Sequence, residues 1–360
     1  MEIAFLAATL CCIAVVLLRL TRVPRWSKTL KNLVWGAAIF VVVSTGFLVW
    51  VNQMVQAAER SGATSGAAFQ VDIMVRRLRT FSSSARHRNA RCTYRDAWAM
   101  SPPVEVVIAQ RELRKTLQVV KQDGPYELVR TPAGEYWIPT RDIDTLAETI
   151  VEQQRDEYEG TGAGVQAGDV VLDCGANVGL YTRHALDKGA KLVVAIEMAP
   201  ESLDCLRRNM AKDIADGRVV VYPKGVWNKD DELQLSSGSE WASTASSVAL
   251  NRGAQGPKVP LTTIDKLVAE LKLPRVDFVK MDIEGAEMEA LQGAVETVRR
   301  FHPRMAISLE HRTTDPDRIP ELVEKLWPNY VSVCGACTNV IGSIQPDVLF
   351  AHTRPGSSTP

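Results

Sequence analysis

The sequence predicts an α/β protein with a doubly wound sheet of seven strands, preceded by apolar helices at the N-terminus. From residue 169 onward, short apolar runs alternate with segments of helical periodicity, which is typical of a parallel sheet covered by helices on both faces. A glycine-bearing turn follows the first of these runs, as it does in nucleotide-binding βα units. Two long uncharged stretches near the N-terminus approach the length that crosses a bilayer.

The 360 residues are enough for one large domain or two ordinary ones. The net charge is zero, but residues 1–95 contain 13 Lys/Arg against 3 Asp/Glu, whereas the remainder contains 29 against 39. This asymmetry predicts a basic front end near an anionic surface and a mildly acidic body, for which we expect no nucleic-acid partner. Seven scattered cysteines do not indicate a disulfide scaffold. Cys334 and Cys337 form a lone C-x-x-C, and we expect thiols there rather than zinc ligands.

The N-terminal region predicts a membrane anchor. Ile3–Leu18 and Leu33–Val51 are uncharged runs of 16 and 19 residues, of which the second is long enough to span and the first is borderline. We therefore expect residues 1–58 to hold one or two transmembrane helices, with residues 3–51 in contact with lipid. A cleaved signal peptide is disfavoured because the only charge ahead of the first run is acidic. Two buried helices of a soluble domain are the alternative.

The rest of the chain divides by composition and periodicity. Residues 59–103 predict a basic juxtamembrane linker, and residues 104–165 predict a helix and a β-hairpin that extend the main domain. Residues 166–353 form the main domain, and residues 354–360 a disordered tail. The strands expected in its sheet are residues 170–172, 192–196, 219–222, 276–281, 305–309, 330–333 and 347–351. The last two have no helix between them and predict an antiparallel hairpin at the edge of the sheet.

The turn after the first strand predicts the cofactor. It reads Asp-x-Gly-x-Asn-x-Gly and comprises Asp173, Gly175, Asn177 and Gly179, whereas a dinucleotide fingerprint reads G-x-G-x-x-G and places amides on a pyrophosphate. A carboxylate ahead of the first glycine would repel a pyrophosphate and attract an ammonium group. S-adenosylmethionine carries an α-ammonium, a sulfonium and no phosphate, so the turn predicts a site for that cofactor.

A second acid supports a nucleoside in this site. The next strand ends at Glu197, 22 residues beyond Gly175, where a carboxylate can accept hydrogen bonds from both ribose hydroxyls. Glu197 fits NAD equally well, so an NAD(P)-dependent oxidoreductase stays open as an alternative on this residue.

Four passages then occur in the order found in a known family. They are V-L-D-C-G-A-N-V-G at 171–179, I-E-M-A-P-E at 196–201, V-P-L-T-T-I-D at 259–265 and F-V-K-M-D-I-E-G-A-E at 278–287. Through them the sequence resembles the FkbM family of methyltransferases, within the class I S-adenosylmethionine-dependent superfamily and its Rossmann-like fold. The resemblance covers roughly residues 126–351 and implies O-methylation, commonly of a sugar or polyketide hydroxyl.

The resemblance also implies which residues bind S-adenosylmethionine. The turn residues would line its methionine end, Glu197 would bind the ribose, and the pair after the third strand would lie by the adenine. The full expected set is Asp173, Gly175, Asn177, Gly179, Glu197, Gly225, Val226 and Asp282.

An alcohol acceptor must lose its proton during attack, and a positioned base contributes about 10²–10⁴-fold. The base should lie at the carboxyl edge of the sheet, where Asp282, Glu310 and His311 follow two strands. Histidine suits this work at neutral pH, whereas Asp282 could instead orient the cofactor or cap a helix. Together with Glu284 these residues could hold a divalent ion, although we expect no metal. Lys280 lies within its strand, so packing or an ion pair is the favoured interpretation.

We therefore expect a membrane-anchored O-methyltransferase acting on a sugar, a glycan, a lipid-linked saccharide or a polyketide-like acceptor. Tyr158 and residues 236–247 are candidates to close over the acceptor, and an ordinary loop is the alternative. A non-catalytic membrane scaffold with a methyltransferase fold is the third hypothesis, beside the oxidoreductase. We expect the catalytic domain on the cytoplasmic face, where the cofactor is supplied. The basic residues within 19–31 place it on the far side if both apolar runs span. The segment after Val51 is also basic, with six arginines within 76–91, and this favours the cytoplasm on that side as well. Both observations are satisfied if one run spans and the other lies in the interface.

Overall fold

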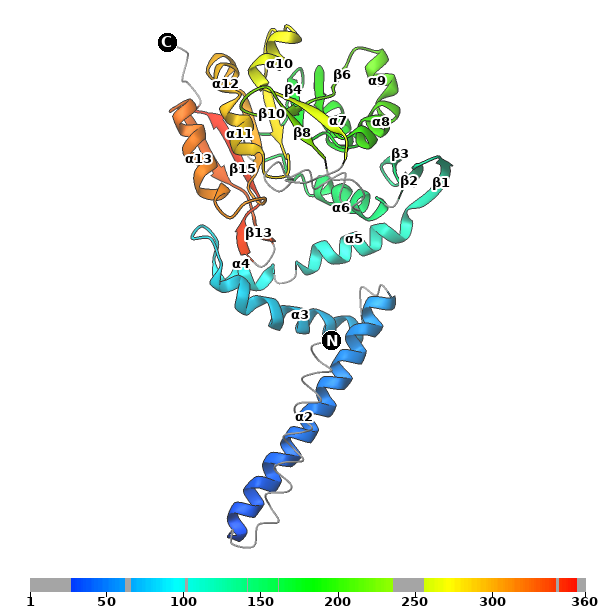
Figure 1. Cartoon of the computed structure of the whole chain (residues 1–360), viewed down its shortest axis with the longest axis vertical. Coiled ribbons are helices and arrows are strands. Elements are labelled where there is room, and N and C mark those ends of the chain that lie inside the picture. The colour runs from blue at the N-terminus through cyan, green and yellow to red at the C-terminus, as the bar shows by residue number, and fades with distance from the viewer. Residues whose placement is uncertain are drawn as a thin grey trace. The chain divides into compact units, whose positions relative to one another are not determined.

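The computed structural model describes residues 27–61, 66–100, 103–140, 142–160, 162–235, 256–340 and 343–354. The first apolar run, the segment 236–247 and the tail beyond residue 354 lie outside the described residues. The chain divides into two compact units, residues 1–80 and residues 81–360, and Figure 1 shows their elements.

In the first unit the main element is α2 (Lys28–Ser61). Its stretch Lys31–Ala57 has a mean hydropathy of 2.1 and is long and apolar enough to cross a membrane. Phe40 and Phe47 on this helix are 73% and 60% exposed, so the helix is not the buried core helix of a soluble domain. Among the described residues one helix meets this test, as an anchor or as a signal, and two spans are not shown.

The second unit is built on a mixed sheet of seven strands, as the sequence predicts. The order across the sheet is β12-β15-β11-β10-β4-β5-β6. The strands are β4 (Val170–Cys174), β5 (Leu192–Ile196), β6 (Val219–Tyr222), β10 (Phe278–Met281), β11 (Arg304–Ser308), β12 (Tyr330–Cys334) and β15 (Val348–Thr353). β15 runs antiparallel to both β11 and β12, which confirms the expected antiparallel pair at this edge. The parallel strands are short and buried on both faces, hence their continuous apolar runs.

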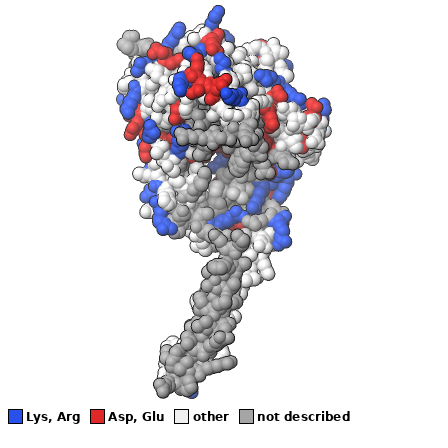
Figure 2. All heavy atoms as spheres, viewed as in Figure 1, with Lys and Arg blue, Asp and Glu red and all other residues white. Residues whose placement is uncertain are grey.

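Helices cover both faces of this sheet (Figure 1). One apolar layer joins the sheet to helices α10 to α13, and the other joins it to α7 and α8. These helices, with α9, are α7 (Leu180–Asp187), α8 (Pro200–Asn209), α9 (Ala211–Ala215), α10 (Ile264–Glu270), α11 (Glu287–Gln292), α12 (Val295–Phe301) and α13 (Asp315–Leu326). On the face seen in Figure 2, acidic and basic side chains are interspersed.

An N-terminal extension packs beside the sheet. It comprises α5 (Val104–Thr116), β1 (Gln118–Asp123), β2 (Tyr126–Thr131), β3 (Gly134–Pro139) and α6 (Ile143–Gln154). The expected hairpin is present as β2 and β3, but β1 adds a third antiparallel strand. The sequence predicts a helix over residues 104–120, whereas α5 ends at Thr116 and β1 follows it. A second small sheet consists of β7 (Gly225–Val226), β8 (Asp231–Gln234) and β9 (Lys258–Thr262).

The sequence of residues 286–300 predicts one continuous helix, but the structure has two, α11 and α12, which are separated at Gly293. A Cβ at this position would lie 2.1 Å from the carbonyl oxygen of Trp227, so the break occurs where another loop approaches the backbone. This contact is with a residue distant in sequence, so the helical pattern does not reveal it.

The segment expected to be a linker contains α3 (Ala67–Arg86) and α4 (Tyr94–Ala99), and α4 begins with a capping box between Thr93 and Asp96. The expectation of a thiol at Cys337 is wrong, because Cys337 forms a disulfide with Cys92. Cys334 is a free thiol, as expected. The two ends of the disulfide are 245 residues apart, so spacing along the chain gave no signal of the pair.

Candidate active site

Two glycines in the left-handed conformation shape the turn after β4. A Cβ at Gly175 (φ +81°) would come 1.9 Å from the carbonyl oxygen of Asp282, in the turn after β10. A Cβ at Gly179 (φ +94°), where α7 begins, would lie 2.7 Å from Leu206. Both the backbone conformation and the close approach therefore require glycine. The result is a tight turn that brings the ends of β4 and β10 together.

Asp173 and Asn177 in this turn each present a buried acceptor atom that receives no hydrogen bond from the described residues. Asp173 is fully buried, and its Oδ2 accepts a hydrogen bond from the Thr182 hydroxyl at 2.6 Å, whereas its Oδ1 has no hydrogen-bond partner in the described parts of the chain. The side-chain oxygen of Asn177 is likewise buried and unsatisfied there. A buried acceptor without a donor is costly, so these two atoms fit a cationic ligand rich in N–H donors and do not fit a pyrophosphate.

Glu197 joins the turn from the end of β5. Its Oε2 accepts a hydrogen bond from the backbone N–H of Asn177 at 2.9 Å, and its Oε1 accepts from the next two backbone N–H groups, each at 2.7 Å. Burial raises the pKa of Glu197, and these hydrogen bonds oppose that rise. Gly225 packs on Met198, since a Cβ there would lie 2.7 Å from the Met198 sulfur, and Val226 is buried next to it. The residues expected at the ribose and the adenine thus meet at the end of β5.

Lys280 connects the turn after β4 to the turn after β10. Its buried ammonium lies 3.8 Å from Asp173 Oδ1 and 3.5 Å from Asp282 Oδ2, and it donates to the Gly175 carbonyl oxygen at 3.2 Å. Burial lowers the pKa of Lys280, but the two carboxylates outweigh burial and raise it. Lys280 is therefore a cation at neutral pH, in the ion-pair role expected for it.

Asp282 also contacts the extension before the sheet. Its Oδ2 accepts a hydrogen bond from the Tyr158 hydroxyl at 3.1 Å. Burial opposes the ionisation of Asp282, but Lys280 and His311 outweigh it and keep the pKa of this carboxyl below its ordinary value. Tyr158, expected to close over the acceptor, therefore contacts a predicted site residue directly.

His311 lies among three carboxylates. Its Nδ1 is 3.0 Å from Glu287 Oε1, and its Nε2 is 3.5 Å from both Asp282 Oδ1 and Glu284 Oε2. Burial favours the neutral imidazole, but these carboxylates outweigh it and raise the pKa of His311 to about 10. The side chain is therefore an imidazolium at neutral pH. Ligand atoms of Asp282, Glu284 and His311 also lie within 4.8 Å of one another, a spacing that could hold a metal ion in place of the imidazolium proton.

Comparison with known proteins decides the family of this site. Residues 173–335 match the family model of the methyltransferase FkbM domain. This part of the chain is an FkbM methyltransferase domain. The match begins at Asp173 and includes the β4, β5, β10 and β11 turns, so the resemblance seen in the sequence is confirmed.

The chain is similar to methyltransferases of known sequence or structure. The hexuronic acid methyltransferase AglP of Haloferax volcanii is 25% identical over 163 residues, which cover 44% of this chain and 62% of that protein. The methyltransferase sdnD of Sordaria araneosa is 25% identical over 194 residues, covering 46% of this chain and 73% of that protein. The crystal structure of an FkbM methyltransferase from Methylobacillus flagellatus is 17% identical, with a TM-score of 0.39, over 71% of this chain and 60% of that one.

Carboxyl groups that resist ionisation surround the His311 side of the FkbM domain. Burial and repulsion from Asp282 raise the pKa of Glu284 to about 8 and the pKa of Glu310 to about 7, although His311 lowers both. Burial and repulsion from neighbouring acids, Glu310 among them, raise the pKa of Glu157 to about 8. The structure thus brings Asp282, Glu310 and His311 together at the carboxyl edge of the sheet, as the sequence predicts.

Two acids of this group were not predicted. Glu152 and Glu157 lie at and just beyond the end of α6, outside the matched segment. Burial and repulsion from Glu157 raise the pKa of Glu152 well above its ordinary value. In the sequence they look like ordinary acids at a helix end, and only the packing of α6 beside the sheet gives them a role in the electrostatics of the site.

Proposed function

We propose that the protein is a membrane-anchored, S-adenosylmethionine-dependent O-methyltransferase for the hydroxyl of a saccharide, a lipid-linked saccharide or a polyketide-like acceptor. The observation that carries this proposal is the pair of buried, unsatisfied acceptors on Asp173 and Asn177 within an FkbM methyltransferase domain. These two atoms would receive the α-ammonium of the cofactor, and Gly175 and Gly179 would let the backbone approach it. The similarity to AglP, a hexuronic acid methyltransferase, supports a saccharide acceptor.

The remaining cofactor contacts follow from the end of β5. Glu197 would bind the ribose with the lone pairs that its three backbone hydrogen bonds leave, and Gly225 and Val226 would lie by the adenine. When bound, S-adenosylmethionine supplies an electrophilic methyl group on a sulfonium, and the sulfur is the leaving group, as a neutral thioether. The protein's residues must then align the acceptor oxygen and take its proton.

We assign the role of the base that removes the acceptor's proton to Glu310. Glu310 follows β11 at the carboxyl edge of the sheet, beside His311. Burial and repulsion from Asp282 raise its pKa to about 7, and a base works best when its pKa lies near the operating pH. His311 was the first choice on sequence grounds, but a pKa of about 10 leaves it protonated, so it would act as the fixed cation that holds Asp282 and Glu284 in place. Asp282, ionised and bound by Lys280 and Tyr158, would orient the ammonium or the acceptor hydroxyl.

The test is methyl transfer by the full chain in detergent. The enzyme is incubated with S-adenosylmethionine carrying a labelled methyl group and with hexuronic acids, neutral saccharides or hydroxylated polyketides. The proposal expects label in at least one of these acceptors as an ether, which survives mild alkali, whereas a methyl ester is cleaved. The Asp173→Asn variant should lose this activity at limiting cofactor. Label found only in esters or amines would contradict O-methylation of a hydroxyl.

A further inference from the structure

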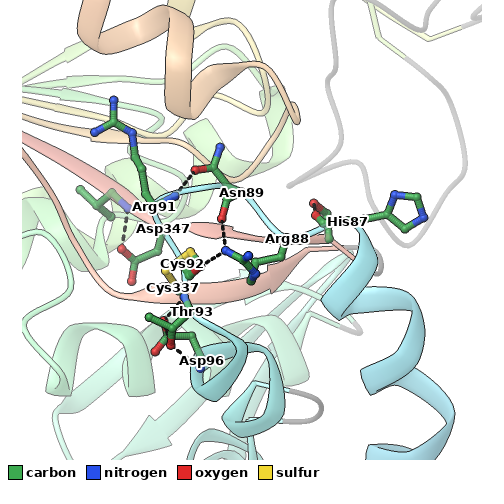
Figure 3. Close-up of a disulfide and its surroundings, with 11 residues drawn as sticks. His87, Arg88, Asn89, Arg91, Cys92, Thr93, Asp96, Cys337 and Asp347 are labelled. Atoms are coloured by element: carbon green, nitrogen blue, oxygen red, sulfur yellow. Dashed lines mark hydrogen bonds between the residues drawn. A yellow bond between two sulfur atoms is a disulfide. The ribbon is translucent and has the colours of Figure 1, made fainter.

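The Cys92–Cys337 disulfide lies within the second unit, where the segment before α4 contacts a C-terminal β-hairpin (Figure 3). Cys92 is 2% exposed and packs with Ala97 and Ile344. Next to it, the backbone N–H of Asn89 donates to the carbonyl oxygen of Ile344 at 2.6 Å, and the Ser343 hydroxyl donates to the carbonyl oxygen of His87 at 2.6 Å. The disulfide therefore joins the segment before α4 to the hairpin of β13 (Cys337–Val340) and β14 (Ser343–Pro346).

This setting is that of a structural disulfide. Redox-active pairs are exposed and lie where a thiolate can attack them, whereas here Cys92 is buried and Cys337 is partly buried against the same apolar cluster. The other cysteines within the described residues are Cys174 and Cys205, both buried, and Cys334, which is partly buried. Structural disulfides form and persist outside the cytosol, because thiol-reducing systems keep cytosolic cysteines reduced.

The charges that flank the apolar helix independently indicate that the chain beyond it lies outside the cytosol. The 15 residues 17–31 contain five Lys/Arg, whereas the 15 residues 58–72 contain one, and the basic residues that begin at Arg76 lie farther from the end of the helix. Cytoplasmic flanks carry the excess of Lys and Arg, so the N-terminal flank of Lys31–Ala57 belongs in the cytoplasm and the chain beyond it belongs on the opposite side. The result is the same whether or not the first apolar run also spans, because residues 17–31 then form the loop between the two spans.

We propose that residues 81–360 lie on the oxidising, non-cytoplasmic side of the membrane with the Cys92–Cys337 disulfide formed. This is the side opposite to the one expected from the cofactor supply. The placement stands on the disulfide and the flanking charges and does not depend on the proposed chemistry. If the chain is also the methyltransferase proposed above, its acceptor is a hydroxyl exposed on that side. Its charged cofactor then needs a carrier, since charged groups do not cross the bilayer core unaided.

The experiment has two readouts on the full chain with a C-terminal epitope tag, in sealed membrane vesicles whose cytoplasmic face points outward. The first is protease protection of the tag: we expect the tag to survive in intact vesicles and to be digested once detergent opens them. The second is a thiol count, in which free thiols are blocked with N-ethylmaleimide during denaturation. The protein is then reduced and labelled with a maleimide polymer that shifts its gel mobility.

Two polymers per chain are expected in the wild-type protein and in the Cys334→Ser control, and none in Cys92→Ser. Digestion of the tag in intact vesicles would overturn the proposal, whatever the thiol count. A wild-type chain that takes up no polymer would also overturn it, even if Cys92→Ser fails to fold. Methyl transfer enters neither readout, so failure of the proposed function would leave this result unchanged.

Discussion

The assignment of the proton to Glu310 predicts a specific change in the pH profile of His311→Gln. In the wild-type enzyme the turnover rate at saturating cofactor should rise with pH through about 7, because Glu310 must lose its proton to act as the base. His311 is the cation that lowers the pKa of Glu310. A nearby opposite charge lowers a carboxyl pKa by up to ~3 units, so removing the imidazolium should move the rise in rate to a higher pH by up to about that amount.

The matched variant is Glu310→Gln. Its turnover rate should no longer rise with pH through about 7, and turnover should slow by about 10²–10⁴-fold. The assay is initial rate against pH from 5 to 10 with labelled methyl groups, accompanied by affinity for S-adenosylhomocysteine, which should change little in either variant. If the rise in rate with pH instead vanished in His311→Gln and persisted in Glu310→Gln, the histidine would be the base and our electrostatic reasoning would be refuted. Activity lost to EDTA and restored by Mg²⁺ would assign the acidic group to a metal.

Three further predictions concern stability, measured by thermal unfolding of the full chain. Gly175→Ala should cost about 1–3 kcal/mol more stability than Gly168→Ala, because both glycines have positive φ but only a Cβ at Gly175 meets another atom within 4 Å. Equal losses of stability in the two variants would contradict the close approach of Gly175 to the turn after β10. Lys280→Met should cost about 3–5 kcal/mol of stability because it leaves buried carboxylates uncompensated. The control Lys212→Met, which removes an exposed ion pair, should cost ~0.5 kcal/mol or less. Similar costs in the two variants would mean that Lys280 does not compensate the charges of Asp173 and Asp282. The pKa of Glu157 is about 8 in the folded chain against an ordinary 4.5, so the folded state holds this proton to a higher pH than the unfolded state does. The free energy of unfolding should therefore fall as pH rises across that interval. Glu157→Gln should reduce this fall, and an unchanged pH dependence of stability would mean that Glu157 does not belong to the buried acidic group.

The parts of the fold that the sequence predicted are those with local causes. Val219–Tyr222 and Leu192–Ile196 are strands with the expected bounds, because strands buried on both faces are uninterrupted apolar runs. The break at Gly293 and the Cys92–Cys337 disulfide have no such local cause. Each depends on residues that only the tertiary fold brings together.

The same division holds for the site. The turn from Asp173 was recognisable because its chemistry is written in consecutive residues. The protonation state of His311 was not, because it depends on Glu284, Glu287 and Asp282, which approach it from the neighbouring turn. An isolated histidine suggests a base titrating near neutrality, whereas three adjacent carboxylates make it a fixed cation.

The assignment of the turn after β4 to S-adenosylmethionine is tested most directly by calorimetry of the full chain in detergent with S-adenosylhomocysteine and, separately, with NAD. We expect S-adenosylhomocysteine to bind and NAD to show no measurable binding. Asp173→Asn removes the charge that would meet the ammonium, so its affinity should fall by roughly 10- to 150-fold, equivalent to ~1.5–3 kcal/mol for a hydrogen bond to a charged group. Asp231→Asn, at an exposed acid of β8, should bind as the wild type does. Tighter binding of NAD, or equal affinity for S-adenosylhomocysteine in Asp173→Asn and the wild type, would contradict the assignment of this turn to S-adenosylmethionine.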